Sequence, residues 1–491
     1  MKRTAVLNVV GLTESLLGPH TPRINALRQA GSLTRIAPSF PAVTCTAQSN
    51  FLTGLPPREH GIVANGWYHR ELAEVQFWKQ SNHVVRGRKL WEELREAHPG
   101  FTCAKLFWWF NMYSTADYSI TPRPIYPADG RKCFDIYAWP YDIRTEIKKE
   151  LGEFPFFGFW GPAAGVATPQ GAPDATTRWI AEAAKWIERR YAPSLNLVYL
   201  PHLDYNLQRL GPLVAADVRR RTPAGTQESA SSRRRLQSAG EDITADLARI
   251  DAIVGDLADF FARQSVQVIV LSEYGITPVD KPVHLNRGFR ERGWLAIREE
   301  LGLELLDCGA SRAFAVADHQ VAHVYVNDRS LLGEVRAVIE QHSGVAQVLD
   351  EAGKRQHGLD HARSGDLVAI AAPNAWFTYY YWLDDRRAPD FARTVDIHRK
   401  PGYDPVELFL DPALRVPKLR IAWRLLQKRL GFRMLMDVIP LDATLVKGSH
   451  GARPADSAEW PVLISPRPAK ANGGALDSTE VYAELKRQIS E

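Results

Sequence analysis

Thr44, at the start of a short predicted helix, is the first residue placed where a nucleophile could act. Thr44 precedes a helix predicted over residues 46–52, which Gly54 and two prolines terminate. The exposed N–H groups at a helix N-terminus attract phosphate oxygens, so a hydroxyl placed there could attack phosphorus. The same hydroxyl could instead only cap the helix. The residue types alone leave both interpretations open.

The apolar segments of the chain predict the sheet that would carry such a site. Val, Ile and Leu dominate short runs bounded by turn residues, which is typical of buried parallel strands. A helix is predicted over residues 243–263, because its apolar residues follow the helical period. This alternation predicts an α/β fold with a doubly wound, mostly parallel sheet, whose ligands gather beyond the carboxyl ends of the strands. The predicted strands are residues 5–10, 195–200, 266–271, 322–326 and 367–371.

Residues 40–65 resemble the nucleophile motif of the type I phosphodiesterase and nucleotide pyrophosphatase family, within the alkaline phosphatase superfamily. They contain Phe-Pro-Ala-Val-Thr and then Thr-Gly-Leu-Pro-Pro-Arg-Glu-His-Gly-Ile-Val-Ala-Asn. Segments 201–212, 270–279 and 448–451 match later motifs in the same order. The resemblance implies a single alkaline-phosphatase-like domain over residues 1–491, with a cap or insert at about 280–440. It also implies that Thr44 is the covalent nucleophile of a phosphodiester or pyrophosphate hydrolase.

The resemblance further implies divalent metal ions, usually zinc, bound by Asp and His residues at the strand ends. Asp204, Glu273 and His450 occupy ligand positions, and Asn8 shares a strand face with the end of the first strand. Three other positions depart from the family pattern, since they are Val10, Gln208 and Tyr274. Valine supplies no donor atom, and amide and phenol groups are poorer zinc ligands than imidazole. We therefore expect one tightly held ion, and a second ion that binds weakly or not at all. Magnesium and manganese are alternatives to zinc. Ordinary ion pairing is the alternative role for Asp204 and Glu273.

Histidines outside these motifs could complete the metal site. His398 lies in a segment of turn residues and mixed charges, and His202 shares the strand face of Asp204. We therefore expect His398 or His202 to supply a further ligand. The other candidate donors are Asp318, His319, His323, His357, His361 and Asp396.

Four segments have an unusual composition. Aromatic residues gather at 101–140 and 376–382, and we favour a role in the core over one in lining a substrate pocket. Residues 213–240 contain two Arg-Arg-Arg runs and predict a mobile basic loop. Residues 412–436 alternate basic and apolar side chains. They could contact anionic lipid peripherally, although we favour a helix that covers the core.

Composition narrows the class of protein. The chain has 61 basic and 56 acidic residues, a net charge of +5 that gives no reason to expect nucleic-acid binding. Its 4 scattered cysteines predict neither a disulfide scaffold nor a thiolate metal site. No apolar run is long enough for a signal peptide or a transmembrane segment. We expect a cytoplasmic enzyme acting on a small phosphorylated substrate.

Two alternatives to this function stay open. The altered ligand positions could belong to a family member that only binds a phosphorylated ligand or partner. They could also belong to a hydrolase of a non-nucleotide phosphoryl or phosphonate compound. The intact Thr44 favours an enzyme, whereas the losses at Val10, Gln208 and Tyr274 favour the alternatives.

Overall fold

The computed structural model describes residues 1–128, 132–169, 171–212, 242–471 and 474–491. In this part of the chain the central sheet has nine strands, in the order β21-β2-β20-β9-β1-β8-β5-β6-β7. Five of the neighbouring pairs are parallel and three, β2-β20, β20-β9 and β6-β7, are antiparallel. The strands are β1 (Thr4–Val9), β2 (Ser32–Ala37), β5 (Cys103–Leu106), β6 (Tyr118–Pro122), β7 (Ile136–Trp139), β8 (Leu195–Leu200), β9 (Gln267–Leu271), β20 (Val462–Ser465) and β21 (Ala475–Asp477).

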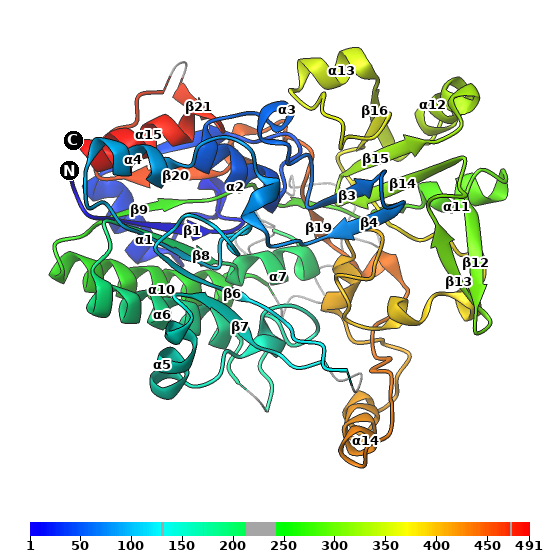
Figure 1. The fold of residues 1–491 in the computed structure, drawn as a ribbon, viewed down its shortest axis with the longest axis horizontal. Helices are drawn as coiled ribbons and strands as arrows, with labels where there is room; N and C mark the ends of the chain where they lie inside the picture. Colours follow the sequence, from blue (N-terminus) through cyan, green and yellow to red (C-terminus); the bar gives the residue numbers. More distant parts are fainter. Residues whose placement is uncertain (129–131, 170, 213–241, 472–473) are drawn as a thin grey trace, which may run out of the picture.

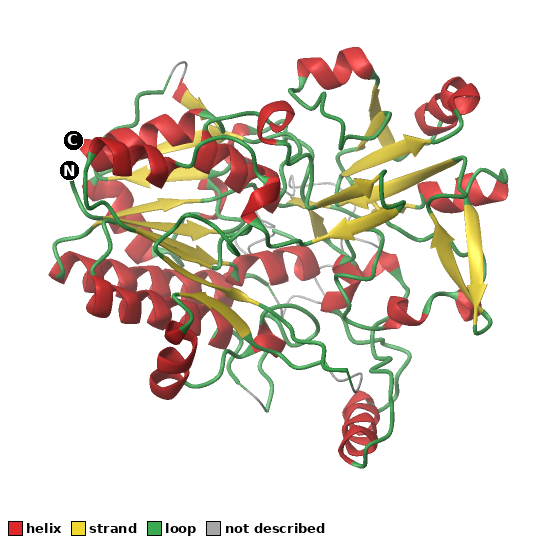
Figure 2. Ribbon diagram, viewed as in Figure 1, coloured by secondary structure: helices red, strands yellow, loops and turns green. Residues whose placement is uncertain are grey.

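Helices cover both faces of this sheet (Figures 1 and 2). One layer joins α1, α5, α6, α7 and α10 through mutual contacts, and the other joins α2, α4 and α15. Burial on both faces explains why β1 and β8 consist almost entirely of buried apolar residues. The helices are α1 (Pro22–Ala30), α2 (Thr44–Thr53), α3 (Pro57–His60), α4 (Leu90–Ala97), α5 (Asp142–Leu151), α6 (Ala175–Tyr191), α7 (His202–Leu210), α10 (Thr244–Arg263) and α15 (Glu480–Ser490).

The parallel register brings distant residues to one edge of the sheet. Asn8 near the end of β1 pairs with Tyr199 of β8 on one side and with Leu271 of β9 on the other. The residues that follow β8 and β9 therefore lie beside the end of β1, as expected where parallel strands share a carboxyl edge. The predicted α/β class and mostly parallel sheet are confirmed.

Two predicted strands of the main sheet belong elsewhere. β15 (Val321–Val326) and β17 (Leu367–Ala371) pair antiparallel in a separate four-stranded sheet, ordered β14-β15-β17-β16. The prediction that they are parallel strands was wrong, because a continuous apolar run indicates burial on both faces and not the direction of pairing.

A second hydrophobic core surrounds this smaller sheet. The aromatic run from Trp376 to Trp382 is almost wholly buried there, which confirms its predicted role in a core. The cap boundary at about 280–440 stays a prediction. The elements of this region are β11 (Lys281–Val283), α11 (Leu285–Glu291), β12 (Ala296–Glu300), β13 (Leu303–Asp307), β14 (Ala313–Asp318), α12 (Leu332–Glu340), β16 (Val345–Leu349), α13 (Glu351–Gln356) and β18 (Ala375–Phe377).

Short elements connect the two regions. The hairpin of β3 (Gly66–His69) and β4 (Glu74–Phe77) contacts β14, and β10 (Thr277–Pro278) pairs with β19 (Gly448–Ser449). A Cβ atom at Gly448 would lie 2.0 Å from the carbonyl oxygen of Leu207, so only glycine allows β19 to pack on α7. This contact places His450, two residues later, beside the end of β8.

Helix α14 (Pro417–Arg429) projects from the rest of the molecule (Figure 1), and of its side chains only Ile421 packs against the second hydrophobic core. None of its residues is buried, so the preferred interpretation of a core-covering helix was wrong. No helix in the described parts of the chain has the length and apolar run needed to cross a bilayer. The predicted basic loop at 213–240 lies outside the described residues.

Candidate active site

Thr44 is the first residue of α2, and its hydroxyl faces the carboxyl edge of the central sheet. The helix cap is Val43, so Thr44 does not have the alternative role of a cap. Instead, Thr44 Oγ1 lies 3.1 Å from Tyr274 Oη, three residues beyond the end of β9. Gly54, with a φ of 70°, ends the helix in the left-handed conformation that glycine adopts without strain. The hydroxyl is thus directed at the sheet edge and not at its own helix.

A chain of hydrogen bonds extends from Thr44 through Tyr274 to Asp204. Tyr274 Oη donates to Asp204 Oδ1 at 3.2 Å. The other carboxylate oxygen accepts from Gln208 Nε2 at 2.9 Å, one helical turn further along α7. Tyr403 Oη in turn donates to Gln208 Oε1 at 3.1 Å. The Asp204 carboxylate is therefore held by neutral donors on both oxygens.

Glu273 is held in the same way from the other side. Its Oε1 accepts from Asn8 Nδ2 at 2.5 Å and from the side-chain amide of Gln48. The Gln48 carbonyl is fixed by the backbone N–H of Trp109 at 2.7 Å. Oε2 of Glu273 is buried and has no partner in the described structure. Glu273 is thus a second carboxyl group anchored by amides near Thr44.

Aromatic and imidazole rings stack against this network. The Tyr274 and His450 rings lie 3.6 Å apart and nearly parallel, at 7°. His450 also lies 3.6 Å from the ring of His319, which stacks on Tyr403 at 3.7 Å. His450 Nδ1 is 2.7 Å from the carbonyl oxygen of Ala42, just before the loop that leads into α2. The stack orders Tyr274 and joins His319, in the turn between β14 and β15, to the main sheet.

Burial sets the protonation behaviour of these groups. Desolvation raises the pKa of Asp204 to about 7 and the pKa of Glu273 to about 8, against the opposing effect of their hydrogen bonds. The same effect lowers the pKa of His450 to about 3, so its imidazole is neutral. The network therefore favours uncharged groups in the absence of a positive charge. Perturbed carboxyl groups clustered in this way are typical of functional sites.

The cluster is slightly exposed to solvent at Thr44 and Asp204. Thr44 retains 4% exposure and Asp204 7%, whereas Asn8 and Glu273 are fully covered. A substrate would therefore meet Thr44 and Asp204 first. The N-terminus of α2 faces this edge and favours a negative charge there.

The residues present do not fit the paired metal site that the resemblance implies. In the described ranges, no group of three or more His, Cys, Asp or Glu residues is placed to hold an ion. Val10, directly after β1, is buried and apolar. The oxygens of Asp204 and one oxygen of Glu273 already accept hydrogen bonds from amide and phenol groups. The cluster is built as a hydrogen-bonded network of neutral donors.

Metal titration should show how this cluster differs from the paired metal site that the resemblance implies. We expect the metal-free chain to bind zinc weakly, and the double variant Gln208→His with Tyr274→His to bind it at least about tenfold more tightly, since each substitution places an imidazole beside Asp204. Isothermal titration calorimetry measures both affinities. The matched control is Gln208→Asn with Tyr274→Phe, which changes the same positions without adding a ligand. Two tight zinc sites in the unmodified chain would contradict the expectation.

The structure joins four of the five predicted metal ligands with Thr44 in this cluster: Asn8, Asp204, Glu273 and His450. It does not bring His398 to them, because His398 Nδ1 faces the carbonyl oxygen of Phe77 at 3.4 Å. His202 does not turn toward the cluster either, since its Nε2 lies 2.9 Å from Asp246 of α10. The two extra histidine ligands therefore find no support.

Some members of the cluster were not identified from the sequence. Gln48 lies four residues after Thr44, so helical spacing places both on one face of α2 and could have revealed it. Tyr403 lies in a loop, and no local pattern connects it with Gln208. His319 was named only as one donor among several, although it enters the ring stack.

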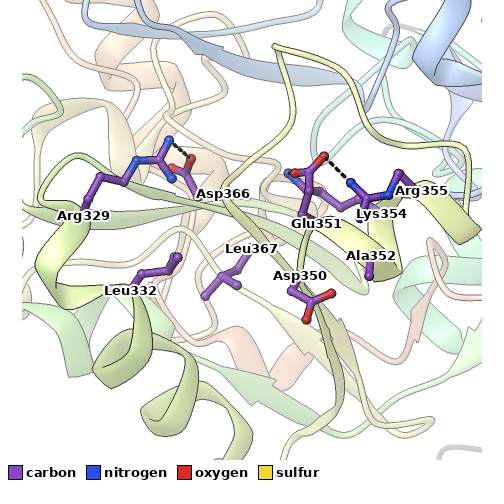
Figure 3. A pocket seen from close by; sticks show the side chains of 9 residues that line it. All are labelled: Arg329, Leu332, Asp350, Glu351, Ala352, Lys354, Arg355, Asp366 and Leu367. Atoms are coloured by element: carbon purple, nitrogen blue, oxygen red, sulfur yellow. Dashed lines mark hydrogen bonds and ion pairs between the residues drawn. The ribbon is translucent and has the colours of Figure 1, made fainter.

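A surface pocket of about 430 Å³ lies in the smaller region and contains none of these residues. Several of its charged side chains form ion pairs (Figure 3): Arg329 with Asp366 at 2.8 Å, Lys354 with Glu351 at 3.0 Å, and Arg355 with Glu351 at 3.4 Å. The pocket therefore does not share the chemistry of the Thr44 cluster.

Comparisons with known proteins identify the family of the chain. The family model for type I phosphodiesterase / nucleotide pyrophosphatase matches residues 4–404. A search of curated proteins found no match.

Solved structures show a similar fold at low sequence identity. Murine ectonucleotide pyrophosphatase / phosphodiesterase 5 is 14% identical with a TM-score of 0.55, and the match covers 100% of this chain and 95% of that one. Phosphonoacetate hydrolase from Sinorhizobium meliloti, in complex with phosphonoformate, is 12% identical with a TM-score of 0.57 and coverage of 100% and 96%. Another structure of the murine protein, an inactive variant, contains AMP. At these identities the likeness establishes the fold alone.

Proposed function

Because the chain belongs to the type I phosphodiesterase / nucleotide pyrophosphatase family of hydrolases, we propose that it cleaves phosphodiester or pyrophosphate bonds with Thr44 as the nucleophile. The observation that carries this proposal is the contact of the Thr44 hydroxyl with Tyr274, which in turn hydrogen-bonds Asp204. A nucleophile, a proton relay and a carboxylate acceptor are thus aligned at the start of a helix. This is the arrangement expected of an activated hydroxyl.

The reaction proceeds in two displacements. Thr44 Oγ attacks phosphorus, the bond from phosphorus to the leaving oxygen breaks, and the threonine proton passes through Tyr274 to Asp204. Water then attacks the threonine phosphoryl ester, and Thr44 regains a proton as the product leaves. The N-terminus of α2 stabilises the charge on the phosphoryl oxygens. Asp204 and Glu273 already hold phenol and amide donors, so no metal-bound step is assigned to them.

Aromatic residues beside the network favour a substrate with a large leaving group. The Trp78 ring lies 4.8 Å from that of Trp109 and 5.8 Å from that of Tyr403, and Trp160 lies 5.6 Å from Tyr403. Trp109 also fixes Gln48 through its backbone. Such rings suit an aromatic or hydrophobic group attached to phosphorus. They support a diester substrate larger than a simple phosphate monoester.

A second candidate function is binding of a phosphorylated ligand without turnover, or hydrolysis of a phosphonate. The occupied oxygens of Asp204 favour the binding role, since the departures from the family pattern leave a closed hydrogen-bonded network. Phosphonate chemistry draws its support from the structural neighbour that contains phosphonoformate.

The partner in this proposal is a small phosphorylated substrate. All four cysteines are described and none forms a disulfide. Free thiols are typical of a reducing compartment, and we propose the cytoplasm.

A substrate panel tests the proposed function. The purified chain is incubated with bis(p-nitrophenyl) phosphate, p-nitrophenyl phosphate and phosphonoacetate, and product release is followed for each. We expect turnover of the diester and much slower turnover of the monoester. Turnover of phosphonoacetate alone would favour the phosphonate reaction. Calorimetric binding of AMP without turnover of any substrate would support the binding role and contradict the enzyme.

A further inference from the structure

Helix α14 presents an apolar stripe to the outside of the molecule. Leu419, Trp423, Leu426 and Leu430 follow the spacing i, i+4, i+7 and i+11, which places them on one face of a helix. They are 67%, 55%, 45% and 64% exposed. Ile421 lies on the opposite face, where it packs against the smaller core. The stripe therefore faces away from the protein.

The apolar surface continues beyond the helix. Phe432 and Leu435 follow the last helical turn and are 65% and 38% exposed. Isolated exposed apolar residues are common on soluble proteins, but seven, Leu425 included, lie within the 17 positions of residues 419–435. Such a segment needs a partner that covers apolar side chains.

The charge around the stripe has a single sign. Residues 412–436 contain seven basic side chains and no acidic one. Two of them, Arg420 and Arg424, pair with Asp437. In the part of the chain that the structure describes, the other five form no ion pair: Arg415, Lys418, Lys428, Arg429 and Arg433. The partner that covers the stripe must therefore carry negative charge.

We propose that α14 and the turn after it lie on the surface of a bilayer that contains anionic phospholipids. The stripe from Leu419 to Leu430 would enter the boundary between headgroups and acyl chains, while Lys and Arg side chains reach the phosphates. Trp423 suits this boundary, because its ring is apolar and its N–H is polar. A second copy of the chain would bring seven further basic residues against the first seven. A nucleic acid would leave the apolar stripe uncovered. This inference goes beyond the proposed function and does not depend on it.

Vesicle flotation with the full chain tests the proposal. The protein is mixed with vesicles of phosphatidylcholine alone, or of equal parts phosphatidylcholine and phosphatidylserine. We expect the protein to float with the anionic vesicles and not with the neutral ones, and high salt to release part of it. Absence of flotation with anionic vesicles would overturn the proposal.

Matched variants separate the stripe from the charge. The double variant Leu419→Glu with Trp423→Glu should reduce the bound fraction at least about tenfold, and Lys428→Glu with Arg429→Glu should reduce it on anionic vesicles. The control is Leu301→Glu, which alters a leucine that is even more exposed, 103%, in the turn between β12 and β13. Thermal melting shows that each variant is folded. Undiminished flotation of both double variants would overturn the proposal, as would a concentration-dependent dimer that Leu419→Glu with Trp423→Glu abolishes.

Discussion

Replacement of Thr44 by alanine should abolish turnover of an aryl phosphodiester, with a fall in kcat of at least about a thousandfold. The substitution removes the only protein atom that the mechanism bonds to phosphorus. It also removes one contact with Tyr274, so we expect the free energy of unfolding to fall by about 1–2 kcal/mol. Steady-state kinetics and thermal melting of the same preparation measure both quantities.

Thr46→Ala is the matched control in the same helix. Thr46 is fully buried, and its hydroxyl donates to the carbonyl oxygen of Ile62 at 3.3 Å and not to the network. This variant should lose similar stability and keep most of its activity. Wild-type turnover by Thr44→Ala, or equal losses in both variants, would remove Thr44 from the reaction.

Tyr274→Phe should lower kcat by about a hundredfold or more, the range of a positioned proton-transfer group. The hydroxyl lies between Thr44 Oγ1 at 3.1 Å and Asp204 Oδ1 at 3.2 Å, so its loss breaks the relay. The phenyl ring keeps its stacking surface on His450. We therefore expect the thermal midpoint to change little and KM to change less than kcat.

Tyr403→Phe provides the comparison one step further from the nucleophile. Tyr403 is also buried and stacked on a histidine, but its hydroxyl reaches Gln208 and not Thr44. Its loss should lower kcat less than about tenfold, since the contact of Tyr274 with Asp204 remains. A larger effect at Tyr403 than at Tyr274 would contradict the relay.

Local sequence patterns predicted the central strands of the main sheet but not the pairing of the strands in the smaller sheet. The runs that became β1, β8 and β9 are buried on both faces and bounded by turns, so composition marked them as core strands. Burial alone could not show that β15 and β17 pair antiparallel in another sheet, because pairing depends on contacts distant in the sequence. The interpretation of α14 failed for a related reason. Amphipathic spacing identifies an apolar face but does not show whether that face packs on the protein core.

The candidate site was predictable where residues follow strand ends or share a helix face. Asn8, Asp204 and Glu273 lie near the ends of adjacent strands, and Thr44 with Gln48 lie one helical turn apart. The contact of Tyr403 with Gln208 joins residues 195 positions apart, and no local pattern encodes it. The role of Tyr274 depends on its hydroxyl reaching Thr44, which only the packed structure shows.

Covalent labelling of Thr44 tests the central claim most directly. The chain is mixed with bis(p-nitrophenyl) phosphate, quenched in acid during turnover, digested and analysed by peptide mass spectrometry. We predict a p-nitrophenyl phosphoryl ester on the peptide that contains Thr44, assigned to that residue by fragmentation and absent from Thr44→Ala. Turnover accompanied by an adduct on another residue, or by direct incorporation of solvent oxygen in a single displacement with inversion at phosphorus, would contradict the claim.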